Sequence, residues 1–153
     1  MGIRRKIQID VDLVQGQGFS THAEFEDFNH EIVLDMVFEF GTGLVLEANA
    51  QLIKYPFPEC PQAIDCVKNL VGYRAVNFGS RKEIFNMVAG PYGCTHMAEL
   101  VMESINARIQ AGDQLIPDWN PELAAERRKT WEKAWTNSCI HYAEPKFRKT
   151  EKE

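Results

Sequence analysis

The sequence predicts an α+β fold, with a three-stranded antiparallel sheet covered on one face by about four helices. Polar and apolar residues alternate in three segments of the first 52 residues, which is the pattern of half-buried strands. Prolines then cluster over residues 56–61, and beyond them apolar residues recur at helical spacing. Strands followed by a separate group of helices are typical of an α+β layer.

The three strands are expected at residues 5–13, 32–40 and 44–52. Between the first two lie a glycine turn at residues 16–18 and an acidic stretch containing Glu24, Glu26 and Asp27. Gly41-Thr42-Gly43 separates the last two, so these are expected to form a hairpin of two long strands.

Four helices are expected after the prolines, because each has start or stop signals in the sequence. In order, these signals are Pro61 with Gly72, the capping box Ser80-Arg81-Lys82-Glu83 with Gly90-Pro91, Gly93 and Gly112 on either side of a helix at about 95–110, and Asn120-Pro121 before Trp131 and Trp135.

The composition is that of a globular protein, with 44% apolar and 25% charged residues among 153. We expect a single domain over residues 1–153, with residues 140–153 as a flexible tail. The net charge is −5 and the basic residues are dispersed except at 146–149, so nucleic acid is not an expected partner. No apolar run is long enough for a signal peptide or a membrane span, and a cytoplasmic protein without a membrane partner is expected. A homo-oligomer is left open.

Two cysteines occupy similar positions at expected helix starts. Cys94 lies in the turn Gly93-Cys94-Thr95-His96, and Cys60 directly precedes Pro61. The unpaired N–H groups of a helix N-terminus favour a thiolate, which is both a nucleophile and a soft metal ligand. Buried structural thiols are the plain alternative, and Cys66 is assigned to that class.

Three segments carry a resemblance to a known family: Pro56-Phe57-Pro58-Glu59-Cys60, Leu70-Val71-Gly72 and Gly93-Cys94-Thr95-His96-Met97. Together they resemble a bacterial family catalogued only as a domain of unknown function, in which Leu is usual at the position of Met97. The resemblance extends to His30 and to Cys139. It implies no particular activity.

The order of the elements is also similar to that of U-type iron-sulfur scaffold proteins. Both have a hairpin, a cysteine at the next helix start, a glycine closing that helix and a second cysteine opening a long helix. This resemblance implies an iron-sulfur-scaffold-like fold with His30, Cys60 and Cys94 at one end of the sheet. The Cys-Gly-Asp triplet of the scaffolds is absent near His30.

On this basis His30, Cys60 and Cys94 are predicted to bind Zn²⁺ or Fe²⁺, with His96 or Cys139 as a fourth ligand or a supporting group. Three protein ligands would leave an open, catalytic position, whereas four would make the site structural. His96, Glu99 and Asp27 are the candidate catalytic residues for proton transfer.

The leading hypothesis is a metal-dependent lyase or hydrolase that acts on a small organic substrate. Aromatic residues near the expected site favour an aromatic substrate, namely Phe28, Tyr55, Phe57 and Tyr92. One alternative is an iron-sulfur cluster or sulfur carrier that uses Cys60 and Cys94. A second is a small interaction protein in which the metal is only structural.

Overall fold

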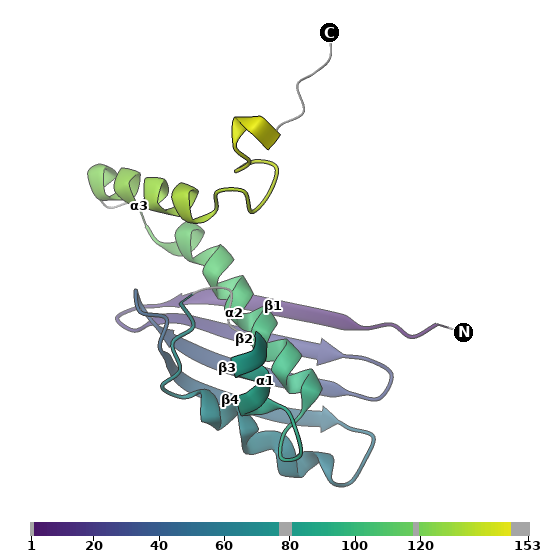
Figure 1. The fold of residues 1–153 in the computed structure, drawn as a ribbon. Helices are drawn as coiled ribbons and strands as arrows, with labels where there is room; N and C mark the ends of the chain where they lie inside the picture. The colour runs from purple at the N-terminus through teal and green to yellow at the C-terminus, as the bar shows by residue number, and fades with distance from the viewer. Residues whose placement is uncertain (1, 77–80, 118–119, 148–153) are drawn as a thin grey trace. The chain divides into compact units, whose positions relative to one another are not determined.

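The computed structural model describes residues 2–76, 81–117 and 120–147 and shows an antiparallel sheet followed by helices (Figure 1). The strands are β1 (Lys6–Val14), β2 (Gly18–Glu26), β3 (Glu31–Glu39) and β4 (Val45–Lys54), paired in sequence order. The helical segments are η1 (Cys60–Leu70), α1 (Arg81–Val88), α2 (Thr95–Leu115), α3 (Pro121–Ala134) and η2 (Pro145–Phe147). The α+β class is therefore confirmed.

The prediction of three strands is wrong, because β2 is a fourth strand where a turn and an acidic stretch were expected. Its buried side chains alternate with exposed or half-exposed ones, and the buried set is Phe19, Thr21, Ala23 and Phe25. Only two members of this set are large and apolar, so the alternation is weak in the sequence. The other three strands lie within a few residues of their expected bounds.

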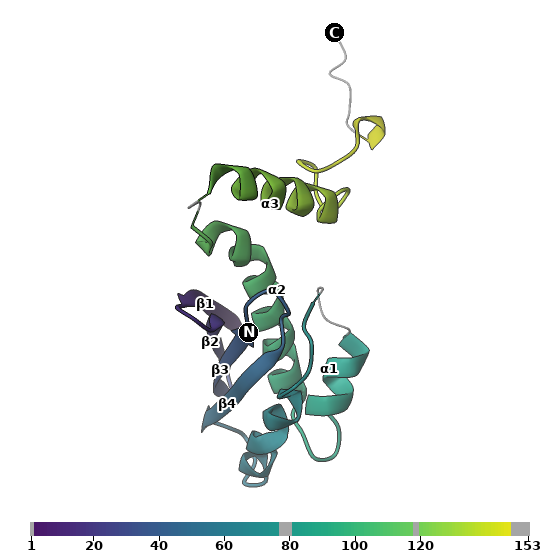
Figure 2. The same cartoon turned by 90° about the vertical axis from the view of Figure 1, so that its left-hand side faces the viewer.

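Helix α2 lies across one face of the sheet and forms the core with it (Figure 2). The apolar row of β3 and the inner side of α2 are buried, and they contribute Ile32, Leu34, Met36, Phe38, Met97, Leu100, Val101 and Ile105. Each large side chain buried in this way stabilises the fold by about 1.5–3 kcal/mol. Segment η1 packs against β4, and α1 packs against both η1 and α2.

The helices start near their predicted positions and differ in type or length. Segment η1 is a 3₁₀ helix with Pro61 in its first turn, and Gly72 follows it at a φ of 90°. Helix α2 continues past Gly112 to Leu115, since a helix tolerates one glycine at a cost of about 1 kcal/mol. The predicted cap Ser80 lies outside the described residues.

The chain divides into two compact units, residues 1–115 and 116–153. In the second unit Asn120 caps α3 by accepting hydrogen bonds from the backbone N–H groups of Glu122 and Leu123. Trp131 stacks on Trp135 at a centroid distance of 6.1 Å, as their spacing predicts. Within the predicted tail, residues 145–147 form η2, and residues 148–153 lie outside the described part of the chain.

In the part of the chain that the structure describes, no helix combines the length and apolar character needed to cross a membrane.

The turn between α1 and α2 has a close backbone approach that only glycine permits. The N–H of Cys94 donates to the carbonyl oxygen of Val88 at 2.9 Å. A Cβ atom on Gly93 would lie 2.0 Å from that same oxygen. Gly93 therefore allows the backbone to reverse directly before the first turn of α2.

This turn gives a stability prediction. Gly93→Ala should lower the free energy of unfolding by at least about 3 kcal/mol, because the backbone must shift away from Val88. Gly90→Ala in the same turn is the control: its φ is 85° but its Cβ would meet no atom within 4 Å, so about 1–2 kcal/mol is expected. Urea denaturation of both variants measures the difference, and equal losses would contradict the steric argument.

Candidate metal centre

The turn between β2 and β3 is organised by the carboxylate of Asp27. Its Oδ1 accepts hydrogen bonds from the backbone N–H groups of Asn29 and His30, both at 2.8 Å. The N–H of Asp27 in turn donates to the carbonyl oxygen of His30 at 2.9 Å. Aspartate favours such turns because its short side chain reaches the backbone two and three residues further on. The local sequence thus fixes where His30 lies.

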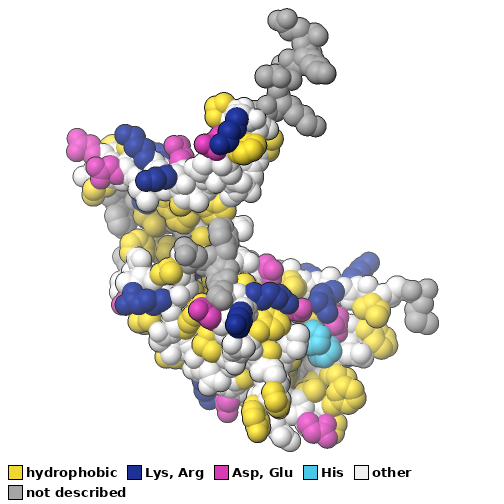
Figure 3. Space-filling model, in the orientation of Figure 1, with side chains coloured by type: hydrophobic (Ala, Val, Ile, Leu, Met, Phe, Trp, Pro, Cys, Tyr) yellow, Lys and Arg dark blue, Asp and Glu magenta, His cyan; other side chains and the backbone are white. Residues whose placement is uncertain are grey.

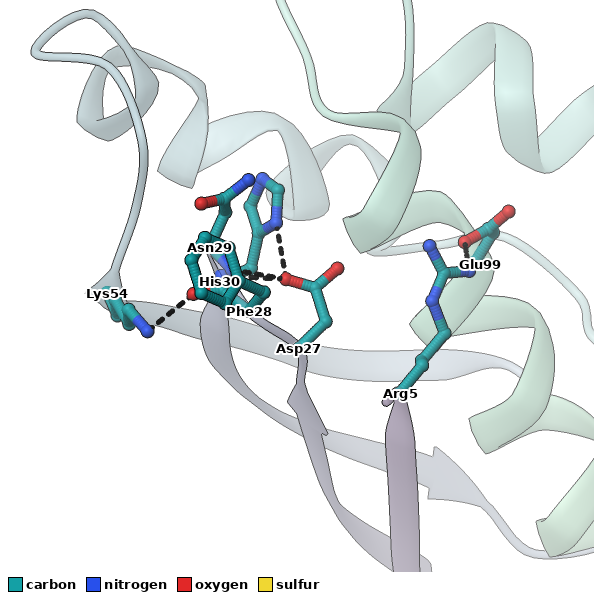
Figure 4. A network of polar contacts seen from close by, with 7 residues as sticks. All are labelled: Arg5, Asp27, Phe28, Asn29, His30, Lys54 and Glu99. Carbon is teal, nitrogen blue, oxygen red and sulfur yellow. Dashed lines mark hydrogen bonds and ion pairs between the residues drawn. The ribbon is translucent and has the colours of Figure 1, made fainter. Parts of the chain in front are cut away.

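The same carboxylate also orients the His30 ring. Nδ1 of His30 lies 2.9 Å from Oδ1 of Asp27 (Figure 4). An ionised carboxylate can only accept, so in the neutral imidazole Nδ1 carries the proton and Nε2 keeps the lone pair that a metal would bind. Of the side chains of Asp27 and His30, only 11% and 16% are exposed. A carboxylate that holds an imidazole in one tautomer is a recurrent feature of metal and acid–base sites.

Helix α2 brings a second imidazole to this turn. The His96 ring, in the first turn of α2, lies 4.1 Å from the His30 ring between centroids, and 5.2 Å from the Phe25 ring. One ligand atom from each of Asp27, His30 and His96 lies within 4.8 Å of the others. Figure 3 shows histidine at the molecular surface, with hydrophobic and acidic side chains beside it.

The environment shifts the pKa values of two of these groups. Partial burial of Asp27 opposes its ionisation, but hydrogen bonds from the His30 ring and from two backbone N–H groups lower its pKa to about 2. Burial, followed by the charges of His30 and Arg5, lowers the pKa of His96 below 6.5. At neutral pH Asp27 is therefore a carboxylate and His96 an uncharged imidazole, which are the states that bind metal.

A charged pair lies beside the cluster. Nη1 of Arg5 is 3.2 Å from Oε2 of Glu99, and its guanidinium lies 4.9 Å from the centroid of Phe25. Another cation, Lys54, donates to the carbonyl oxygen of Phe28 at 2.6 Å. In Figure 4 the Arg5–Glu99 pair and Lys54 lie on opposite sides of Asp27.

Two imidazoles and one carboxylate form a donor set that suits Fe²⁺ and other divalent transition metals. Three protein ligands leave positions open for water or a substrate oxygen, as in catalytic sites. The arrangement can thus hold a cation and expose it to a small molecule. It also contains a metal-free option, since Asp27 and His30 by themselves resemble an acid–base pair.

This grouping differs from the ligand set expected from the sequence. It includes the predicted ligand His30, together with Asp27, which was predicted to transfer protons. Its third member, His96, was predicted either as a fourth ligand or supporting group or as a proton-transfer residue. Among the described residues no cysteine belongs to it. Cys60 is at the start of η1, Cys94 directly precedes α2, and the exposed Cys139 lies in the second unit.

The remaining predictions concern two residues close to this region. Glu99 is on α2 one turn beyond His96 and pairs with Arg5. Cys66, expected to be structural, is buried, and burial raises the pKa of its thiol to about 11. A thiol of that kind is unreactive at neutral pH.

Sequence reasoning missed Arg5 and Phe25. Phe25 is fully buried in β2, and the alternation from Phe19 to Phe25 was the signal that could have identified it. Arg5 belongs to the basic run before β1, and nothing in that run distinguishes it from Arg4.

The electrostatics of the cluster can be tested by titration. His96 should titrate below 6.5, whereas His22 should titrate above it, because a hydrogen bond from its ring to Asp35 raises the pKa of His22. A lowered pKa means that the unfolded chain binds more protons, so the contribution of His96 to stability is complete above pH 6.5 and declines as the pH falls below it. Proton NMR of the imidazole resonances in metal-free protein measures both values, and a His96 midpoint at or above that of His22 would contradict this geometry.

The family comparison covers the strands and most of α2. A family model described as a protein of unknown function (DUF2889) matches residues 4–110, which include Arg5, Asp27, His30 and His96. No curated protein and no solved structure matches the chain. The likeness to iron-sulfur scaffolds therefore stays a prediction. Since the match spans more than two thirds of the sequence, the chain belongs to the DUF2889 family of proteins of unknown function.

Proposed function

We propose that this protein is a metal-dependent enzyme that binds one divalent ion, Fe²⁺ or Zn²⁺, through Asp27, His30 and His96. The observation that carries the proposal is the convergence of these three side chains, from a hairpin turn and a helix start, to within 4.8 Å. His30 supports it further, because its ring is already held with one nitrogen free.

The reaction that fits this site is Lewis-acid chemistry on a small organic substrate, of the lyase or hydrolase type. A bound ion would polarise a water molecule or a carbonyl oxygen. With His96 assigned as a ligand, Glu99 is the nearby carboxylate that remains for proton transfer. An aromatic substrate is favoured by Phe28, an exposed residue adjacent to Asp27 in the turn.

Metal binding by variants tests the proposal. Wild-type protein should take up one equivalent of Co²⁺, a spectroscopic substitute for Zn²⁺ or Fe²⁺, and gain thermal stability. When the free Co²⁺ concentration is 100 times the dissociation constant, the free energy of unfolding should rise by about 2.7 kcal/mol. Asp27→Ala, His30→Ala and His96→Ala should each weaken binding at least about 10-fold, as measured by titration of the visible absorption of Co²⁺.

Two variants serve as controls. His22→Ala removes an imidazole that also contacts carboxylates, Asp35 at 2.7 Å and Glu24 at 3.5 Å, and it should leave Co²⁺ affinity unchanged. Cys94→Ala should likewise have no effect, and the wild-type spectrum should lack a thiolate-to-cobalt charge-transfer band. Loss of Co²⁺ binding in Cys94→Ala would instead favour the cysteine-containing ligand set. A brown protein with labile sulfide would favour the iron-sulfur carrier.

A second candidate is metal-free acid–base catalysis by Asp27 and His30, favoured by their 2.9 Å contact. It is distinguished by the same titration. If wild-type protein binds neither Co²⁺, Zn²⁺ nor Fe²⁺ while its fold is intact, the acid–base pair becomes the better assignment. Stoichiometric binding that Asp27→Asn weakens favours the metal enzyme, since the amide is a poorer ligand than the carboxylate.

A further inference from the structure

We propose that the substrate of this site carries a carboxylate, which the guanidinium of Arg5 binds beside the metal ion. The inference rests on the proposed function, because it names the substrate class of the same centre. It depends on three features of Arg5: its place, its unused hydrogen-bond donors and the charge around it.

Arg5 lies against Phe25, the buried ring that the His96 ring also contacts. The guanidinium carbon lies 4.9 Å from the centre of that ring, and the His96 ring lies 5.2 Å from it. Because Phe25 is fully buried in β2, its ring is a rigid surface on which the side chains of Arg5 and His96 pack. A cation over an aromatic face is attracted by the negative charge of that face, so this contact helps to fix the guanidinium.

Most of the donors of Arg5 remain available. The Arg5 guanidinium has five N–H groups in a planar fork, and among the described residues only Nη1 has a partner, Oε2 of Glu99 at 3.2 Å. About half of the side chain is exposed. A ligand carboxylate could therefore accept two parallel hydrogen bonds, the geometry for which arginine is best suited.

The charges around the centre also favour an anion. Asp27 supplies one negative charge and the two imidazoles supply none, so a divalent ion bound by them keeps a net positive charge. Arg5 and Glu99 balance each other. At the adjoining strand ends Lys54 lies opposite Glu31 and Lys6 lies opposite Glu26, so these charges also offset one another. The positive charge that an incoming carboxylate would meet is therefore that of the bound ion and of the guanidinium it contacts, which strengthens binding.

Benzoate binding to the Co²⁺-loaded protein tests the proposal. Benzoate should perturb the visible spectrum of Co²⁺, whereas benzamide, its uncharged analogue, should bind at least about 10-fold more weakly. Arg5→Gln should weaken benzoate binding about 10-fold to 100-fold, the range for loss of charge-assisted hydrogen bonds. Arg4→Gln removes the same charge one residue earlier, where the side chain is exposed, and should change affinity less than twofold.

Glu99→Gln gives a readout that a purely structural role for Arg5 would not produce. Glutamine can still accept a hydrogen bond from Nη1 but carries no charge. Because the competing negative charge is removed, benzoate should bind more tightly than to wild-type protein. If Arg5→Gln no longer binds Co²⁺, Arg5→Lys takes its place, and weaker benzoate binding than in wild type is again expected because an ammonium lacks the planar fork.

The outcomes distinguish a failure of the carboxylate inference from a failure of the proposed metal site. Benzoate affinity that is the same in wild type and in the Arg5 variants overturns the inference, as does a Co²⁺-loaded protein that benzoate does not perturb. In both cases the metal site itself stands, because the Co²⁺ spectrum is present. Failure of wild-type protein to bind Co²⁺ overturns the proposed function and this inference together.

Discussion

The arrangement of the site depends on one buried ring, Phe25. It ends the inward-facing row of β2, is inaccessible to solvent, and contacts residues from three other segments: Arg5 at 4.9 Å, His96 at 5.2 Å and His30 at 6.3 Å. Packing in a protein core is close and resists displacement. A side chain fixed by the core therefore sets the separation of the two imidazoles, and the turn at Asp27 only has to orient one of them.

That dependence explains why the sequence identified the residues of the site but not the ligand set that they form. Asp27 and His30 are three residues apart, and both stand out in the sequence as polar groups at a strand end. His96 stands out beside Cys94 in a turn released by Gly93. The link between the two segments is the packing of the first turn of α2 on the end of β2. Since β2 was not recognised as a strand, the residue pattern by itself did not show that link. The resemblance to iron-sulfur scaffolds placed His30 near the start of this helix, but with Cys60 and Cys94 as the other ligands.

The cysteines were predicted as ligands because a helix N-terminus favours a thiolate, but no described cysteine belongs to this cluster. A helix N-terminus favours a thiolate wherever it lies, so the local argument applies equally to Cys60 and Cys94. It contains no information about which groups face them. Long-range geometry decides that, and in the described residues it groups the imidazoles of His30 and His96 with a carboxylate.

Exchanging thiolates for a carboxylate alters the chemistry expected of a bound ion. Thiolates favour Zn²⁺, Cu⁺ and iron-sulfur clusters, whereas two imidazoles and a carboxylate favour harder divalent ions and keep coordination positions open. They also leave the ion with a larger net positive charge, because three protein ligands supply only one negative charge. Asp27 would donate less electron density to the ion than a free carboxylate, because its Oδ1 already accepts three hydrogen bonds from the turn. An ion bound in this way would polarise an oxygen ligand more strongly than one bound by thiolates, and this is the reason for proposing Lewis-acid catalysis over sulfur or cluster transfer.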